Sequence, residues 1–337
     1  MSIDSAILNH LKLDPSNVTS SGGVGGGTSS ASTSSITVKG SNGTTTKYFI
    51  KTGKGKAAEV MFAGEHQSLT AIRDIVPTLC PRSYGHGKLA DTPNRAFLVT
   101  DFLDLSGRGS SASSNANIMT LAQKLAELHT TPAPTPKGYD KPQFGFPVPT
   151  CCGDTQQDNA FCSSWEDFYA NHRLRFIVAQ SQKSNGTDKQ LEDMVEATCT
   201  KVIPRLIGDK HLNNGKGVAP VVVHGDLWSG NASMGRLPGM TGPEDIIYDA
   251  SAVYAHSEFE LGIMKMFGGF GGGFLKEYHQ LVPKTEPVDE YDDRVALYEL
   301  YHHLNHHAMF GGGYRGGAMR IMKDLNAKYG VGDWSEL

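Results

Sequence analysis

The chain of 337 residues has no long apolar run, little net charge and few cysteines. No segment is apolar over the length that a bilayer requires, and residues 1–10 lack the basic stretch and apolar core of a secretory signal. The formal net charge of −4 gives no basis for binding nucleic acid or an anionic membrane surface. The five cysteines are odd in number and thinly spread, which favours reduced thiols over a disulfide framework. These absences predict a cytoplasmic protein without nucleic-acid or membrane partners.

The sequence contains enough apolar residues for more than one modest core. An apolar fraction of 39% with 20% charged residues suits a soluble globular protein. The length exceeds that of one ordinary domain, so we expect one large or two modest domains. Because the net charge is negative, a nucleotide site would need local positive charge from a lysine or a metal ion.

Residues 20–37 are rich in glycine, serine and threonine, and this segment allows two interpretations. Composition alone predicts a flexible linker. The alternative is a pair of strands in a small, half-solvated sheet, joined by a glycine-rich turn. The hairpin signal Asn42-Gly43 and the strand-like run 47–51 favour the second interpretation. In such a hairpin, backbone amides can approach nucleotide phosphates without a Cβ in the way. The residues that we assign to this role are Gly22, Gly23, Val24 and Gly25.

A lysine at the end of one predicted strand and a glutamate in the helix that follows it are candidates for an ion pair. Lys51 ends the strand-like run, and a helix is expected over about residues 56–74. Glu65 falls in the apolar stripe of that helix, where an unpaired charge would be costly. Lys51 is its obvious partner, and such a strand-lysine to helix-glutamate pair positions nucleotide phosphates in kinases.

Residues 97–103 predict a buried strand that runs into a connector, where Asp101 and Leu103 would offer backbone groups to an adenine edge. Composition then changes to a Gly/Ser-rich loop, followed by an amphipathic helix that Asn117 caps. We therefore predict two domains, residues 1–103 and 104–337. Further helices are expected over about residues 163–180, 187–206, 256–283 and 289–309.

The most informative segment is His224-Gly225-Asp226-Leu227-Trp228-Ser229-Gly230-Asn231. It follows an apolar strand, and a second apolar strand ends in Asp249. In the phosphotransferase relatives of protein kinases, an aspartate accepts the proton of the substrate hydroxyl. An asparagine five positions on and a later aspartate hold magnesium. On this pattern Asp226 is the catalytic base, and Asn231 and Asp249 are the magnesium ligands.

Other chemistries have weaker support in the sequence. The glycine segment has neither the Gly-x-Gly-x-x-Gly spacing of a dinucleotide site nor the Gly-Lys-Ser/Thr of a Walker loop. No nucleophile elbow is present. Four histidines at 302, 303, 306 and 307 could bind zinc, but no third-ligand cluster accompanies them. We expect these histidines to pack or to contact an acceptor.

The residues of these motifs and their order resemble those of the fructosamine kinase, or ketosamine-3-kinase, family. The ordered set of Lys51, Glu65, the segment 224–231 and Tyr248-Asp249 carries the resemblance, and Leu227 to Asn231 is its most discriminating part. The similarity spans about residues 18–320. Further matching segments are 61–65, 125–129, 145–146, 151–159, Trp165, 254–258, 267–270 and 304–306.

This resemblance implies an α+β, bilobal, protein-kinase-like fold. The N-lobe would hold a small antiparallel sheet and one helix, and the C-lobe would be larger and mostly helical. It implies ATP- and Mg²⁺-dependent phosphorylation of the 3-hydroxyl of a ketosamine, either a small molecule or a glycated lysine on a protein. The 3-phosphate would then eliminate and free the amine, which is deglycation. Trp228 would face the sugar-amine substrate, and His306 would line the acceptor pocket.

Several positions depart from the family pattern. Ala250-Ser251 stands where Pro-Ala is common, Ser257 where arginine is common, and Glu260 where aspartate is usual. None of these removes a catalytic group, but they leave the substrate preference open. A kinase of another small hydroxyl substrate, such as an aminoglycoside, choline or a sugar, remains the alternative. A catalytically silent nucleotide-binding module is disfavoured because the full set of motif residues is present.

Overall fold

The computed structural model describes residues 3–22, 31–40, 43–105 and 118–330. The chain forms two compact units. The first comprises residues 1–124, 148–156 and 230–252, and the second comprises residues 125–147, 157–229 and 253–337. This division differs from a single boundary after residue 103, because the first unit also takes up two later segments. None of the helices in the described part of the chain combines the length and apolar character of a membrane span.

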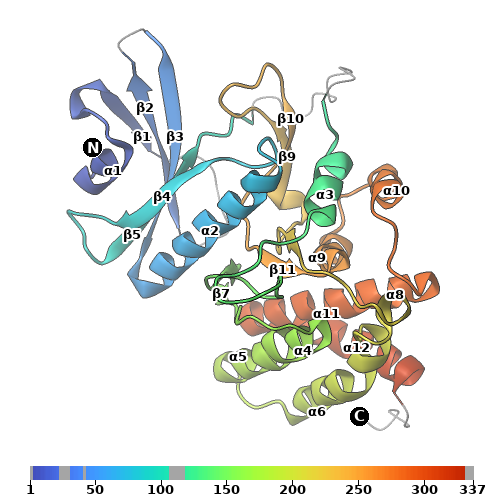
Figure 1. Ribbon diagram of the computed structural model, residues 1–337. Coiled ribbons are helices and arrows are strands. Elements are labelled where there is room, and N and C mark those ends of the chain that lie inside the picture. Colours follow the sequence, from blue (N-terminus) through green and yellow to red (C-terminus); the bar gives the residue numbers. More distant parts are fainter. Residues whose placement is uncertain (1–2, 23–30, 41–42, 106–117, 331–337) are drawn as a thin grey trace. The chain divides into compact units, whose positions relative to one another are not determined.

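An antiparallel sheet of five strands forms the centre of the first unit, in the order β1-β2-β3-β5-β4 (Figure 1). Its strands are β1 (Val18–Gly22), β2 (Ser32–Lys39), β3 (Thr45–Lys54), β4 (Ser83–Lys88) and β5 (Arg95–Asp101). The helices of this unit are α1 (Ser5–Leu11), a 3₁₀ turn at Pro15–Asn17, and α2 (Gly55–Ile75), which lies against β4 and β5.

Apolar residues along β5 explain why both faces of this sheet are covered. Successive side chains of a strand point to opposite faces. Phe97 and Val99 pack with Ile7 of α1, whereas Leu98 packs with Phe62 of α2. All five side chains are almost fully buried. The sheet therefore holds β3 and α2, the elements that carry Lys51 and Glu65, in a fixed register.

Two hairpins complete the first unit. They are β6 (Cys151–Cys152) with β7 (Thr155–Gln156), and β9 (Ala232–Gly235) with β10 (Glu244–Ile247). A buried lysine fastens β10: the Nζ atom of Lys124 lies 2.8 Å from the Glu244 carboxylate and donates to the carbonyls of Thr78 and Asp245. A lysine in this position is tolerated because every partner is an acceptor. The hairpin that carries the predicted metal ligands is thus part of the first unit.

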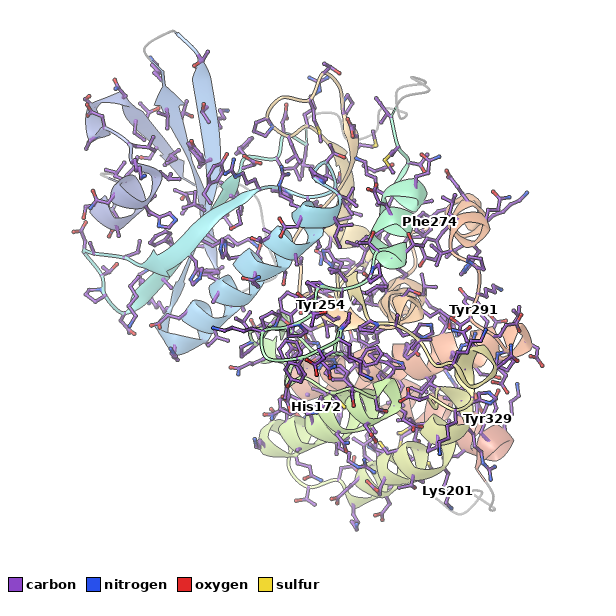
Figure 2. The ribbon with its side chains drawn as sticks, viewed as in Figure 1. His172, Lys201, Tyr254, Phe274, Tyr291 and Tyr329 are labelled. Carbon is purple, nitrogen blue, oxygen red and sulfur yellow. The ribbon has the colours of Figure 1, made fainter. Side chains whose placement is uncertain are left out.

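Helices make up most of the second unit, and its core surrounds α11 (Tyr291–Phe310). Leu297, Tyr298, Leu300, Tyr301 and Leu304 of this helix are almost fully buried. Strands β8 (Val221–Val223) and β11 (Val253–Ala255) pair antiparallel. Tyr254 of β11, labelled in Figure 2, places its ring 5.0 Å from that of Phe146. The helices are α3 (Leu121–Thr130, which begins in the first unit), α4 (Trp165–Tyr169), α5 (Phe176–Asn185), α6 (Lys189–Ala197), α7 (Ile203–Leu206), α8 (Leu212–Gly215), α9 (Glu260–Phe267), α10 (Gly272–Leu281), α11 (Tyr291–Phe310) and α12 (Tyr314–Tyr329).

The remaining turns of this unit are short. π-helical turns at Ala170–Arg175 and Thr198–Val202 join α4 to α5 and α6 to α7. The second of these precedes Pro204, which has no N–H to continue the regular hydrogen-bond ladder. Single 3₁₀ turns occupy Ser257–Phe259 and Val288–Glu290, and a further one, Ser229–Asn231, starts in this unit and ends in the first.

The predicted fold class, with a small antiparallel sheet and a larger helical part, is confirmed. The predicted helices 56–74 and 289–309 correspond to α2 and α11. The predicted helix 256–283 is interrupted after Phe267, because a run of glycines separates α9 from α10. Helix α12 escapes prediction because Gly316 and Gly317 weaken its helical signal. A Cβ at Gly317 would lie 2.4 Å from the His303 ring, so α12 needs glycine there to pack against α11.

Candidate active site

Three charged side chains meet on the first unit. The Nζ atom of Lys51, on β3, donates to both carboxylate oxygens of Glu65, on α2, at 2.7 and 2.9 Å. It also donates to Oδ1 of Asp249 at 2.6 Å. The predicted pairing of Lys51 with Glu65 is therefore present, and Asp249 is a third member that the sequence did not predict.

The three members differ in exposure. The side chains of Lys51 and Glu65 are 12% and 10% exposed, whereas that of Asp249 is 47% exposed. Burial alone would lower the pKa of Lys51, but the carboxylates of Glu65 and Asp249 outweigh burial and raise it. Lys51 thus stays fully charged at neutral pH and can attract an anionic group.

The hairpin of β9 and β10 explains how Asn231 and Asp249 reach the same place. Ala232 pairs with Ile247, and just beyond this pair the N–H of Tyr248 donates to the Asn231 carbonyl at 3.0 Å. The two predicted metal ligands therefore flank one end of the hairpin. Asp249 has a φ of +59°, a left-handed conformation that is uncommon for residues other than glycine. Such strain tends to occur at functional sites.

The segment after Asp249 is hydrogen-bonded to α2. The Ala252 N–H donates to Oγ of Ser68 at 2.9 Å, and the Ala252 carbonyl accepts from Thr150 at 3.3 Å. Ser68 lies one turn beyond Glu65 on the same helix. The position of Asp249 relative to the lysine–glutamate pair is thus fixed from both sides.

The side-chain oxygen atoms at this end of the hairpin suit Mg²⁺, which also binds substrate phosphates, better than a metal ion whose ligands all come from the protein. Magnesium takes oxygen ligands, and it is commonly bound by one or two protein side chains together with substrate phosphates. Asn231 and Asp249 carry two side-chain oxygen atoms of this kind. No group of three or more His, Cys, Asp or Glu residues among the described residues could hold a metal ion. The arrangement therefore suits an ion that arrives with nucleotide phosphates.

On the second unit, a buried carboxylate holds the backbone of the predicted catalytic loop. The loop leaves β8 at His224, where Val223 pairs with Val253 of β11. The N–H groups of His224 and Gly225 donate to Glu260, on α9, at 2.5 and 3.0 Å. Gly225 has a φ of +80°, which glycine adopts without a steric penalty. This anchor fixes the chain direction immediately before Asp226.

Within the loop, Asp226 is half-buried, and its N–H donates to Nδ1 of His224 at 3.3 Å. The Asp226 carbonyl accepts from the Trp228 N–H at 3.1 Å. His224 therefore supports the backbone of the loop. Glu260 is also held as an anion: burial would raise its pKa, but the nearby His129 and the His224 backbone lower it overall.

The predicted substrate residues Trp228 and His306 are brought together through Phe267, at the end of α9. The ring centroid of Phe267 lies 5.6 Å from that of Trp228 and 5.1 Å from that of His306. Nδ1 of His306 contacts the His302 carbonyl at 2.8 Å. Phe267 is a member of this cluster to which the sequence had given no role.

The two residues that we predict to contact adenine, Asp101 and Leu103, differ in their hydrogen bonds. The Asp101 carboxylate accepts from the Arg82 N–H at 2.9 Å and from the Tyr84 hydroxyl at 2.8 Å, and the Asp101 N–H donates to the Arg82 carbonyl. Asp101 is therefore engaged in supporting the sheet. The backbone of Leu103 makes no hydrogen bond to another residue that the structure describes.

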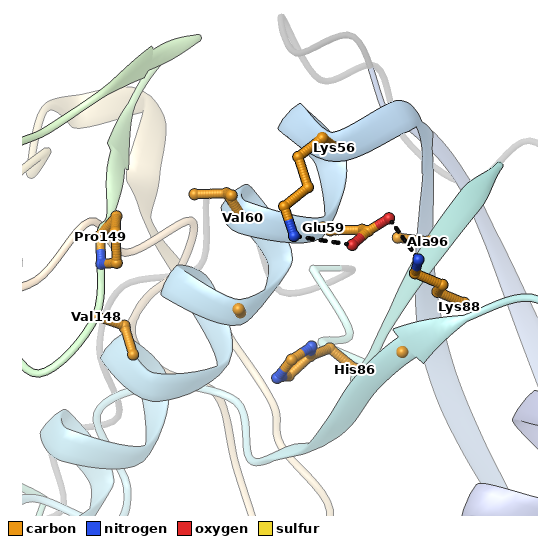
Figure 3. A pocket seen from close by; sticks show the side chains of 10 residues that line it. Lys56, Glu59, Val60, His86, Lys88, Ala96, Val148 and Pro149 are labelled. Carbon is orange, nitrogen blue, oxygen red and sulfur yellow. Dashed lines mark hydrogen bonds and ion pairs between the residues drawn. The ribbon is translucent and has the colours of Figure 1, made fainter.

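Of the predicted phosphate-binding residues, Gly22 ends β1, and Gly23, Val24 and Gly25 lie outside the described residues. A separate pocket of about 340 Å³ lies beside α2 (Figure 3). Glu59 pairs there with Lys56 and Lys88, each at 3.3 Å. None of the predicted site residues lines this pocket, so we do not assign the reaction to it.

A strand lysine paired with a helix glutamate, an Asp–Asn loop after a buried strand and a later aspartate define a protein-kinase-like phosphotransferase. The model of the fructosamine kinase family matches residues 2–328. The chain belongs to this family, and it is an ATP-dependent kinase.

Curated relatives are similar over most of this chain. The chain is 34% identical over 333 residues to the ketosamine-3-kinase of Mus musculus, which covers 94% of this chain and 97% of the relative. It is 35% identical over 278 residues to the chloroplastic protein-ribulosamine 3-kinase of Oryza sativa subsp. japonica, which covers 82% of this chain and 72% of the relative.

Solved structures share the fold at lower identity. A Haemophilus somnus protein assigned as a fructosamine-3-kinase has a TM-score of 0.70 at 17% identity, and the match covers 96% of each chain. Aminoglycoside phosphotransferase APH(4)-Ia has a TM-score of 0.53 at 13% identity, over 95% of this chain and 97% of that chain. At these identities the likeness shows the fold alone.

Proposed function

We propose that the protein transfers the γ-phosphate of ATP to the 3-hydroxyl of ketosamines, with Mg²⁺ as the second cofactor. Elimination of the 3-phosphate would then free the amine, so the biological role would be deglycation. The observation that carries this proposal is an intact set of Lys51, Glu65, Asp226, Asn231 and Asp249 in a chain with these relatives. The relatives are named for ketosamine and ribulosamine substrates.

The residues of the first unit would bind the nucleotide. Lys51, oriented by Glu65, would bind ATP phosphate oxygens, which would take over the position that Asp249 occupies on its Nζ atom. Asp249 and Asn231 would then be available for Mg²⁺, which supplies charge neutralisation on the phosphates when it is bound. The backbone of Leu103 would meet the adenine edge, and the hairpin that includes Gly22 would cover the phosphates.

The residues of the second unit would act on the acceptor. Asp226 would accept the proton of the 3-hydroxyl as its oxygen bonds to the γ-phosphorus and the bond to the ADP oxygen breaks. Glu260 would act as a positioning residue, because it holds the backbone of the loop rather than the substrate. Trp228 and His306 would contact the sugar-amine, and an indole face suits a cationic or sugar group.

The test measures ADP release with ATP and Mg²⁺ on three acceptors side by side: a fructosyl-lysine analogue, a ribulosyl-lysine analogue and an aminoglycoside. We expect turnover of one or both ketosamines and none of the aminoglycoside. Phosphate on the 3-hydroxyl is checked by NMR of the product before it eliminates. Turnover of the aminoglycoside alone would contradict the proposal and favour the alternative acceptor class.

A further inference from the structure

We propose that the pocket beside α2 binds a small organic carboxylate with an apolar body, and that the bound molecule stabilises the position of α2 from which Glu65 contacts Lys51. All of the residues that line this pocket belong to the first unit. None of them is a residue that we assign to the nucleotide, the metal ion or the acceptor. The inference therefore goes beyond the proposed function and does not depend on the identity of the acceptor.

The pocket has room for a small organic molecule. Its volume of about 340 Å³ lies within the range of about 300–1,000 Å³ that is typical of ligand sites. Its walls come from the first turns of α2, from β4 with one residue of β5, and from the segment 148–149 (Figure 3). Three of the lining residues are small, Ala63, Gly87 and Ala96, so their side chains leave this space open.

Two lysines and one glutamate supply the charge of the pocket. The Nζ atoms of Lys56 and Lys88 each lie 3.3 Å from a different carboxylate oxygen of Glu59 (Figure 3). The lysine side chains are 83% and 63% exposed, so their ammonium groups can turn toward a second anion. Exposed ion pairs contribute little to stability, so this exchange of partners costs little. The lining then has one positive charge in excess, which favours a ligand with a single negative charge.

The rest of the lining is mainly apolar. It includes Val60, Ala63, Ala96, Val148 and Pro149. An inorganic anion would leave these side chains without a partner, whereas a molecule with an apolar body would remove their surfaces from water. An uncharged apolar compound would leave the lysines unused. A carboxylate carries one negative charge, so a small organic carboxylate satisfies both parts of the lining.

The walls of the pocket are also the segments that position the charged residues of the active site. Ala63, which lines the pocket, is two residues before Glu65 on α2. A Cβ at Gly64, between them, would lie 2.6 Å from the Pro149 carbonyl oxygen, so α2 lies directly against the segment 148–150. That segment in turn donates a hydrogen bond to the chain that follows Asp249. A ligand in the pocket therefore contacts both supports.

The direction of the effect follows from the arrangement in which the pocket is present. The pocket is open while Lys51 contacts Glu65, so a ligand that binds there stabilises this arrangement. Lys51, oriented by Glu65, would bind the phosphates of ATP. The carboxylate and ATP thus favour the same position of α2, and because coupling between two binding sites is reciprocal, each raises the affinity for the other.

The experiment uses the full-length protein without an acceptor. The probe is hydrocinnamate, which joins a phenyl ring to a carboxylate. Two comparison compounds each lack one part: hydrocinnamyl alcohol lacks the charge, and acetate lacks the apolar body. Ligand-observed NMR measures the affinity of each compound, and calorimetry measures the Kd for Mg²⁺-ATP with and without saturating hydrocinnamate.

Lys88→Glu is the test variant, because it reverses the charge of an exposed side chain at the pocket. Lys88→Arg keeps the positive charge and should keep the site. The matched control is Lys328→Glu. Lys328 is 57% exposed and pairs with Asp293 in the second unit, so it has the same kind of ion pair away from the pocket.

We expect hydrocinnamate to bind the wild type at least about fivefold more tightly than either comparison compound. Lys88→Glu should weaken this binding at least about tenfold, whereas Lys88→Arg and Lys328→Glu should stay within about twofold of the wild type. Saturating hydrocinnamate should lower the Kd for Mg²⁺-ATP about twofold to tenfold in the wild type and leave it unchanged in Lys88→Glu.

Three outcomes overturn the inference. They are the absence of saturable binding to the wild type, equal binding to the wild type and Lys88→Glu, and binding that leaves the Kd for Mg²⁺-ATP unchanged or raises it. In each of these cases the proposed function stands, because no acceptor takes part. A wild type that binds no Mg²⁺-ATP in the absence of hydrocinnamate would instead contradict the proposed function.

Discussion

Replacing Glu260 by glutamine tests how the catalytic loop is positioned. Glu260 is almost fully buried, and its two carboxylate oxygens accept the N–H groups of His224 and Gly225. Glutamine has nearly the same shape but only one acceptor oxygen. Its NH₂ group would face one of the two N–H donors, so one charge-assisted hydrogen bond is lost and the other becomes neutral.

The expected size of the effect follows from these two bonds. A hydrogen bond to a charged group contributes about 1.5–3 kcal/mol, and a neutral one contributes about 0.5–1.5 kcal/mol. Losing one charged bond and weakening the second amounts to about 3 kcal/mol. If this energy is what holds Asp226 in place, kcat falls on the order of 100-fold, at 1.36 kcal/mol per tenfold. The KM for ATP should not change, since Lys51 and Asp249 belong to the first unit.

Steady-state ADP release over a range of ATP concentrations measures both parameters for Glu260→Gln. The matched control is Glu258→Gln, a neighbouring buried carboxylate that pairs with Arg294 at 2.7 Å rather than with the loop. The control should lose thermal stability but keep kcat at a temperature well below its Tm. A wild-type kcat in Glu260→Gln, or equal losses of kcat in both variants, would refute the positioning role.

Three further outcomes are expected. Asn231→Ala should raise the Mg²⁺ concentration needed for half-maximal ADP release at least about tenfold, and an unchanged Mg²⁺ requirement would show that Asn231 is not a metal ligand. Excess EDTA should abolish turnover of the wild type. Lys51→Met should raise the KM for ATP on the order of tenfold to 100-fold, as measured by initial rates, and retention of the wild-type KM would contradict phosphate binding by Lys51. Burial lowers the pKa of His256 from 6.5 to about 4, so the unfolded chain takes up a proton there that the folded protein refuses. The contribution of His256 to the free energy of unfolding should therefore fall by about 3 kcal/mol as the pH drops from about 6.5 to about 4. Urea titrations of the wild type and of His256→Gln measure it as the difference between their pH dependences, and identical pH dependences would contradict it.

The sequence predicts those contacts of the first unit that depend on a single strand and the helix beside it. Lys51 and Glu65 are predictable as a pair because a charge in an apolar helical stripe needs a partner. The third contact, from Asp249 to Lys51, depends on a hairpin that returns to the sheet nearly two hundred residues later. No local pattern encodes that return, so the sequence could suggest only that Asp249 follows a strand.

The anchoring of the catalytic loop shows a second limit. Glu260 can be recognised from the sequence as a departure from the usual aspartate, but its role cannot. Its partners are two backbone N–H groups. Every residue except proline has such a group, so the residue types at these positions do not indicate the contact.

The central claim is that Asp226 accepts the proton of the acceptor hydroxyl, and Asp226→Asn tests it most directly. Asparagine keeps the shape of the side chain but cannot act as the base. ADP release with a ribulosyl-lysine analogue and ATP affinity by calorimetry are measured on the same preparation. We predict that kcat falls by a factor of about 10²–10⁴ while the Kd for Mg²⁺-ATP stays within about twofold. A near-normal kcat, or the loss of ATP binding together with activity, would contradict the assignment of Asp226 as the base.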